Sequence, residues 1–197
     1  MIDSRLEGAA AFAGALLFFS TGIALSADLA AIRPKAQPCF ACHGDEGNSS
    51  NPAVPSIAGQ PSKFLTTALF FFRQGDRKNE QMSPVAAALS NPDMNDLAAY
   101  FSAQKPAAPK HKARPENAKA GAELSQKFNC TQCHGPQLMG QQQMPRLAGQ
   151  QLEYLRAQLR GFKAGTRADS DGNMTAAAQA LSDKDIDVLV DYIAGLN

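Results

Sequence analysis

The stretch Cys39–His43, with the sequence CFACH, returns 91 residues later as CTQCH at Cys130–His134. These two segments contain all four cysteines of the 197-residue chain and two of its three histidines. Four cysteines are too few for the disulfide framework of a chain this long, and they occur as two close pairs. The two pairs are therefore the most informative feature of the sequence.

Both pairs belong to an internal repeat whose offset is 90 to 92 residues. Such a period is the signature of a duplicated structural unit. The blocks that match are Cys39–Gly44 with Cys130–Gly135, Pro55–Arg77 with Pro145–Arg167, and Met82–Tyr100 with Met174–Tyr192. The offset changes only between these blocks, so insertions fall in loops, and the chain is predicted to hold two copies of one small domain.

The repeat divides the chain into four expected segments. Residues 28–104 form the first domain, 105–116 a linker and 117–197 the second domain, and residues 1–27 precede them. Residues 8–25 are uncharged and are followed by Ser26 and Ala27, which is typical of an export signal cleaved near residue 27. Arg5 lies between two acidic residues, which makes a weak signal, so an uncleaved membrane anchor stays an alternative. Both alternatives place the rest of the chain outside the cytoplasm.

The linker, KPAAPKHKARPE, contains three prolines and is predicted to be extended and semi-rigid. Residues 105–119 carry five Lys or Arg and one acidic residue, whereas the two domains are almost balanced in charge. These basic side chains suit either a solvated tether or the docking of an acidic partner.

Composition and periodicity predict an all-α fold. A mean hydropathy of -0.27 excludes a polytopic membrane protein. A net charge of +1 argues against recognition of nucleic acids. Apolar residues at helical spacing run from Phe64 to Phe72 and again from Tyr154 to Phe162. Ser90 and Ser182 each precede an Asp by three residues, a helix-capping signal.

The motif Cys-x-x-Cys-His is typical of covalent haem c attachment. Its thiols lie one helical turn apart and can form thioethers with the two haem vinyl groups, with the histidine against the iron. A shared zinc site is disfavoured because 87 residues separate Cys42 from Cys130. A thioredoxin-like pair requires strands that the pattern lacks, and disulfides within such short loops are strained. We therefore expect two covalently attached haem c groups.

Haem iron with one histidine ligand needs a sixth ligand, which a methionine commonly supplies in small domains. Met82 and Met174 are the only matched methionines, and they follow the histidine of their haem motif by 39 and 40 residues. We therefore predict that His43 with Met82, and His134 with Met174, ligate the two irons. The other candidates lack a methionine counterpart in the other copy: Met94, Met139 and Met144.

The chain after residue 27 resembles the dihaem class I cytochromes c, most closely those of the c-four type. The resemblance rests on CFACHGDEGN, PSIAGQ and QMSPVAAALS in the first copy and on CTQCHG, PRLAGQ and NMTAAAQALS in the second. It implies two tandem all-α cytochrome c domains, in which the carbonyls of Pro55 and Pro145 accept hydrogen bonds from the haem-ligating histidines. Pro34 and Pro38 depart from the pattern, so a short or irregular opening helix is expected in the first domain.

Filled axial positions on both irons predict an electron-transfer protein rather than an enzyme. The resemblance implies a periplasmic carrier, soluble or anchored, that takes single electrons from a quinol-oxidising complex towards a terminal oxidase. The alternative is a dihaem electron-transfer subunit of a periplasmic dehydrogenase complex. A dihaem peroxidase is disfavoured because it needs one haem that can open. Phe70 and Phe71 lack apolar counterparts in the second copy and suggest either burial between the domains or a docking patch for a redox partner.

Overall fold

The computed structural model of the chain describes the backbone of residues 21–197 and the side chains from Leu29 onward. Most of the expected export segment, residues 1–20, lies outside the described residues. Within the described range the chain forms helices and loops and no strand beyond one isolated bridge, which confirms the predicted all-α fold. No helix of the described part is both long enough and apolar enough to cross a membrane.

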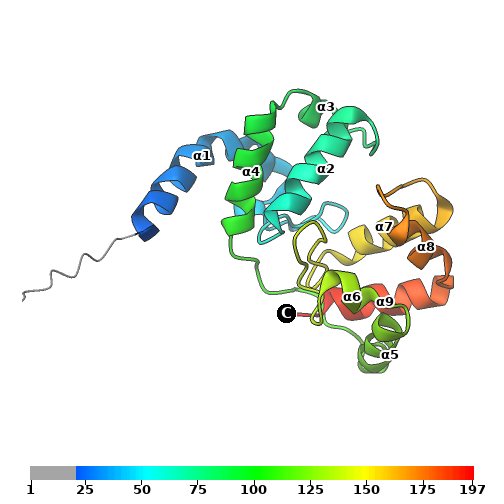
Figure 1. Ribbon diagram of the computed structural model, residues 1–197. Helices are drawn as coiled ribbons and strands as arrows, with labels where there is room; N and C mark the ends of the chain where they lie inside the picture. Colours follow the sequence, from blue (N-terminus) through cyan, green and yellow to red (C-terminus); the bar gives the residue numbers. More distant parts are fainter. Residues whose placement is uncertain (1–20) are drawn as a thin grey trace, which may run out of the picture.

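The helices form two lobes that are joined by an extended stretch (Figure 1). The first lobe contains α1 (Thr21–His43), a short 3-10 turn η1 (Asp45–Gly47), α2 (Ser62–Gln74), α3 (Met82–Ala87) and α4 (Asn91–Ala103). The second contains α5 (Pro115–Lys127), α6 (Cys130–His134), α7 (Leu152–Ala164), α8 (Asn173–Gln179) and α9 (Asp183–Ala194). In the first lobe, α1 packs on α4, and α2 packs on both α3 and α4. In the second lobe, α5 packs on α9, and α7 packs on both α8 and α9.

Each lobe has its own hydrophobic core. The core of the first lobe is centred on α4 and includes Leu97, Tyr100 and Phe101, with Leu65 from α2. The core of the second lobe is centred on α9 and takes Leu155 from α7. Cys39 and Cys130 pack at the edges of the two cores, so each haem motif begins where a core ends.

The opening helix differs from the expectation. Helix α1 continues through Pro34 and Pro38 to His43, although each proline removes one backbone hydrogen bond. Ala36, on the same stretch, is fully buried in the first core, so packing against α4 outweighs the loss. In the second domain the chain breaks at Asn129, which has a φ of 57° and separates α5 from α6.

The linker lies against the protein rather than in open solvent. Its lysines are exposed, but Pro106 and Pro109 are partly buried and lie over the turns at Gly59 and Gly149. A β-carbon at Gly59 would lie 2.5 Å from Cγ of Pro106, so only glycine permits this approach. Exposure of the lysines fits both expected roles of the linker, a solvated tether and the docking of an acidic partner, whereas Pro106 and Pro109 pack on the protein.

The two domains meet through an approximate two-fold arrangement of Gln60 and Gln150, which are equivalent in the repeat. The Gln60 amide donates to the carbonyl of Arg146 and accepts from its N–H, both at 2.9 Å. The Gln150 amide makes the same pair with the backbone of Ser56, both at 2.8 Å. Because Ser56 is itself equivalent to Arg146, each domain gives the other the same contact.

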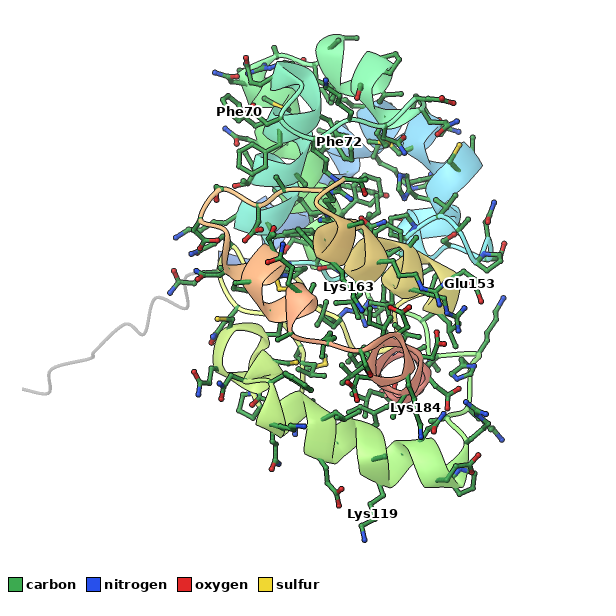
Figure 2. The ribbon with its side chains drawn as sticks, turned by 90° about the vertical axis from the view of Figure 1, so that its right-hand side faces the viewer. Phe70, Phe72, Lys119, Glu153, Lys163 and Lys184 are labelled. Carbon is green, nitrogen blue, oxygen red and sulfur yellow. The ribbon has the colours of Figure 1, made fainter. Side chains whose placement is uncertain are left out.

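The two phenylalanines of α2 do not fill this interface together. Phe70 is 40% exposed, and Phe71 is only partly buried. In Figure 2, Phe70 lies at the outer edge of the first domain, while Phe72 lies above α7 of the second. The expectation of burial between the domains is wrong for Phe70, which packs beside Arg73 instead.

Candidate functional site

Each haem motif lies at the end of a helix that leads to its histidine. Cys39 and Cys42 are on the last turn of α1, and Cys130 and Cys133 are on α6. A spacing of three residues places both sulfurs of a pair on one helix face. The first cysteine of each pair is partly buried and the second is exposed, and no disulfide joins them.

His43 and His134 are buried, with exposed fractions of 8% and 3%. The Nδ1 atom of His43 lies 2.8 Å from the carbonyl oxygen of Pro55, and Nδ1 of His134 lies 2.8 Å from that of Pro145. A carbonyl oxygen can only accept, so Nδ1 carries the proton and donates it. The lone pair of each neutral ring is then on Nε2.

Burial also favours the neutral form of these rings. Desolvation lowers the pKa of His43 and of His134, and the carbonyl hydrogen bond offsets only part of that effect. Nε2 of His134 is buried and has no hydrogen-bond partner. A buried lone pair without a donor is costly unless a metal takes it. The two sites therefore fit a haem iron bound through Nε2, with the thiols of the same motif in position for thioethers.

The two matched methionines lie in the first turn of short helices that pack on α2 and α7. The N–H of Met82 donates to Oδ1 of Asn79 at 2.8 Å. The N–H of Met174 donates to a carboxylate oxygen of Asp169 at 2.7 Å, and the N–H of Thr175 donates to the other at 3.1 Å. Each methionine is thus held by a polar side chain of the preceding turn. Their role as iron ligands stays a prediction.

Sequence reasoning missed Asn79 and Asp169. They stand three and five residues before their methionines, in a stretch where the copies differ in length, so no shared pattern marks them. Among the described residues, no group of three or more His, Cys, Asp or Glu comes together, so the cysteine pairs do not form a shared metal centre.

Comparison with known proteins places both halves of the chain in one family. The family model described as Cytochrome c matches residues 35–105 and again residues 118–197. Each match contains one haem motif, one matched methionine and the proline that faces the histidine.

Similar proteins also match the chain as a whole. It is 38% identical to cytochrome c4 of Pseudomonas aeruginosa over 188 residues, which cover 90% of this chain and 93% of the relative. It is 35% identical to the thiosulfate dehydrogenase electron acceptor of Thiomonas intermedia, covering 98% of this chain and 92% of the relative. The structure of reduced recombinant cytochrome c4 from Pseudomonas stutzeri superposes with a TM-score of 0.79 at 35% identity, covering 88% and 98%.

Proposed function

Because the chain belongs to the cytochrome c family, we propose that it carries single electrons on two haems, each held within one domain. The chain is a dihaem electron-transfer cytochrome with two covalently attached haem c groups. The proposed domains are residues 28–104 and 117–197. The proposed haem-binding residues are Cys39, Cys42, His43, Pro55 and Met82 in the first, and Cys130, Cys133, His134, Pro145 and Met174 in the second.

The observation that carries the ligand assignment is the environment of the two histidines. A backbone carbonyl fixes the orientation of each ring, and burial keeps the ring neutral, so the lone pair on Nε2 has one fixed direction. A carbonyl partner on the far nitrogen also makes Nε2 a better donor to a metal. The same support in both copies predicts equivalent ligation of the two irons.

Haem iron supplies a change of valence by one electron, at a potential that its axial ligands raise or lower. The residues of this chain would bind the haem and set its position. His43 and Met82 would close the two faces of one site, and His134 and Met174 those of the other. With both faces closed, no small substrate can coordinate, and one electron enters and leaves each domain without exchange of ligands.

The proposed setting is the periplasm, with the chain soluble or anchored through its first residues. There it would receive electrons from a quinol-oxidising complex and pass them towards a terminal oxidase. Similarity across almost the whole chain to a thiosulfate dehydrogenase electron acceptor supports a second candidate. In that function the protein is the dihaem subunit that accepts electrons from a dehydrogenase.

Purification of the native protein under mild conditions separates these two functions. A carrier is expected to purify without a partner and to be reduced by membranes supplied with quinol. A dehydrogenase subunit is expected to purify with a second chain in fixed ratio. Co-purification in fixed ratio, together with no reduction by quinol-oxidising membranes, would overturn the carrier proposal. Intact mass of the same sample reports both haems and the length of the mature chain.

A further inference from the structure

The linker is hydrogen-bonded to both domains. It runs from the end of α4 in the first lobe to the start of α5 in the second (Figure 1). In the first domain, Oδ1 of Asn48 accepts from the N–H of Ala107 at 2.7 Å. In the second domain, the carboxylate of Asp191 accepts from the N–H of Arg114 at 3.0 Å and lies 2.9 Å from Nε2 of His111. The backbone of the linker is therefore fixed near both of its ends.

The side chains of the linker divide into an inner and an outer set. From Pro109 to Arg114, partly buried residues alternate with exposed ones. His111 and Ala113 belong to the partly buried set, and Lys110 and Lys112 to the exposed set. Side chains two residues apart in an extended segment point to the same side. Lys110 and Lys112 therefore share the outer side, with their Cα atoms at most about 7 Å apart.

Three lysines of the linker carry positive charges that no acidic side chain balances. Among the described residues, Lys105, Lys110 and Lys112 are exposed and form no ion pair; they are named the linker lysines. Glu116 is the single acidic residue of the sequence from 105 to 119, and it lies 4.0 Å from Arg114 instead. Like charges within about 8 Å of one another repel even at physiological salt. A free tether would let them separate, whereas this linker is held at both ends.

We propose that the linker lysines form a docking surface for an acidic patch on the protein that exchanges electrons with this chain. Positive charges presented from a fixed backbone attract and orient a surface of carboxylates, and they raise the association rate more than the affinity. Asn48 joins the linker to the loop that follows the first haem motif, so a partner docked here binds next to that loop. This inference rests on the proposed electron-transfer function but not on which of the two candidate donors is correct.

An anionic lipid surface would also attract these lysines, but the linker suits a protein better. Binding at a lipid surface is strengthened by apolar side chains that insert beside the charges. In the part of the chain that the structure describes, the exposed large hydrophobic side chains are Phe70, Val85 and Met139, and none of them belongs to the linker. The fixed positions of the lysines also match fixed carboxylates of a folded protein, whereas a fluid lipid surface requires no fixed positions.

Electron transfer from a defined acidic protein tests this surface. Reduced flavodoxin, an acidic protein that donates single electrons, is mixed with the oxidised full-length holoprotein, and the absorption of ferrous haem is followed. The triple variant Lys105→Gln, Lys110→Gln and Lys112→Gln is expected to be reduced about tenfold more slowly than the wild type at low ionic strength. Its rate is also expected to depend less on salt. Arginine at the same three positions keeps the charges and is expected to keep the wild-type rate.

The matched control removes the same charge elsewhere on the surface. Lys63→Gln, Lys78→Gln and Lys184→Gln replace three exposed lysines that form no ion pair among the described residues. This control is expected to keep most of the wild-type rate. Equal losses in the two triple variants would show a general effect of net charge, and an unchanged rate in the linker variant would show that the acidic donor docks elsewhere; either result would overturn the proposal.

The native donor and a lipid surface complete the test. Membranes of the source cells supplied with quinol are expected to reduce the linker variant more slowly than the control variant, and equal rates would overturn the proposal. If these membranes do not reduce the wild type either, the carrier function fails, while the flavodoxin comparison still decides the docking surface. Vesicles of equal parts phosphatidylcholine and phosphatidylglycerol are expected to bind the wild type and the linker variant equally. Vesicle binding that only the linker variant loses would assign the lysines to a lipid surface and overturn the proposal.

Discussion

Asn79 and Asp169 each accept from the N–H of the methionine in their loop, but with different chemistry, and Asn79 also accepts from the N–H of Gln81. Asn79 offers a neutral amide oxygen to Met82, whereas Asp169 offers a carboxylate to Met174 and Thr175. Hydrogen bonds to an ionised acceptor are stronger than those to a neutral one. The methionine loop of the second domain is therefore expected to be the more firmly held.

Removing the carboxylate tests this difference. Asp169→Ala is expected to lower the free energy of releasing Met174 by about 1 to 3 kcal/mol, because two backbone donors lose an ionised acceptor. Asn79→Ala is expected to lower the free energy of releasing Met82 by a smaller amount. The absorption of methionine-ligated ferric haem, followed through a guanidinium titration, measures the release. Ser170→Ala, at an exposed neighbour, is the control, and equal losses in it and in Asp169→Ala would contradict the account.

Asp191 fastens the linker to α9. Its carboxylate accepts from Asn117 Nδ2 at 2.9 Å and from the N–H of Arg114 at 3.0 Å, and lies 2.9 Å from Nε2 of His111. Burial alone would raise the pKa of Asp191, but these hydrogen bonds outweigh it and hold the pKa below its usual value. The ionised form therefore stabilises the folded state.

This depressed pKa gives a pH dependence of definite sign. The stabilisation is complete above the ordinary aspartate pKa of about 3.9 and is lost as the pH falls through the lower folded value. Asp191→Asn is expected to lower the free energy of unfolding at pH 7 by about 1 to 3 kcal/mol, with a smaller difference at pH 3. Guanidinium unfolding followed by circular dichroism measures both. Asp187→Asn, at a carboxylate that is 47% exposed, is expected to change little; a difference for Asp191→Asn that is constant with pH would contradict the assignment.

At the residue scale, the sequence predicted the residues that occur at equivalent positions in both copies of the repeat. Each proline carbonyl that the resemblance implied does face its histidine, at 2.8 Å in both copies. Asn79, Asp169 and Asp191 escaped prediction because their partners are backbone groups or a distant linker. Such contacts depend on how loops close in space, which no spacing in the chain records.

At the scale of elements, local signals predicted the closing helices well. Ser90 and Ser182 cap α4 and α9, and each forms a full capping box with the Asp three residues later. The opening helix was harder to predict, since Pro34 and Pro38 lower local helix propensity while burial of Ala36 against α4 restores the helix. Where tertiary packing competes with a local helix propensity of this size, the packing determines whether the helix forms.

The crossing of α5 and α9 depends on one glycine. A β-carbon on Gly121 would lie 2.2 Å from Cβ of Tyr192, so alanine there must push the two helices apart. Gly121→Ala is expected to destabilise the second domain by about 1 to 3 kcal/mol. In Gly161→Ala, also within a helix, the new atom would lie 3.4 Å from Cβ of Arg167, and better helix propensity offsets the crowding. Thermal unfolding compares the two, and a Gly121→Ala variant as stable as Gly161→Ala would contradict the close crossing.

At the scale of the molecule, the two domains recognise each other through equivalent residues. Gln60 and Gln150 are 3% and 4% exposed, and each satisfies a backbone N–H and carbonyl of the opposite domain. Duplication of one domain with such a side chain gives both halves of the contact at once.

Because these contacts are symmetric, substitution of either glutamine is predicted to destabilise the protein by a similar amount. Gln60→Ala and Gln150→Ala are each expected to lower the free energy of unfolding by about 1 to 3 kcal/mol, because buried backbone groups lose their partners. Guanidinium unfolding of the holoprotein measures the change, and Gln74→Ala, at an exposed position of α2, is the control. Unfolding curves that coincide with the wild type in both variants would show that the domains do not keep this interface in solution.

The repeat carried most of what the sequence predicted about the whole molecule. Its helical periodicity predicted the all-α fold, and its haem motifs predicted the cytochrome c family and the two covalent haems; the structure and the comparisons confirm these predictions. The arrangement of the domains escaped prediction because Gln60 and Gln150 are matched in sequence without any sign of where they point. Burial of Phe70 between the domains, one of the two roles that the sequence left open, was wrong, because an apolar residue on a helix suggests burial although single exposed rings are ordinary.

The central claim is that each iron is ligated by a histidine and a methionine of its own domain. The most direct test is the absorption of methionine-ligated ferric haem in the holoprotein and in its methionine variants. Met82→Ala and Met174→Ala are each expected to lose about half of this signal, and the double variant all of it, while Met139→Ala and Met144→Ala keep it. A signal that survives in the double variant, or that disappears with Met139 or Met144, would contradict the account.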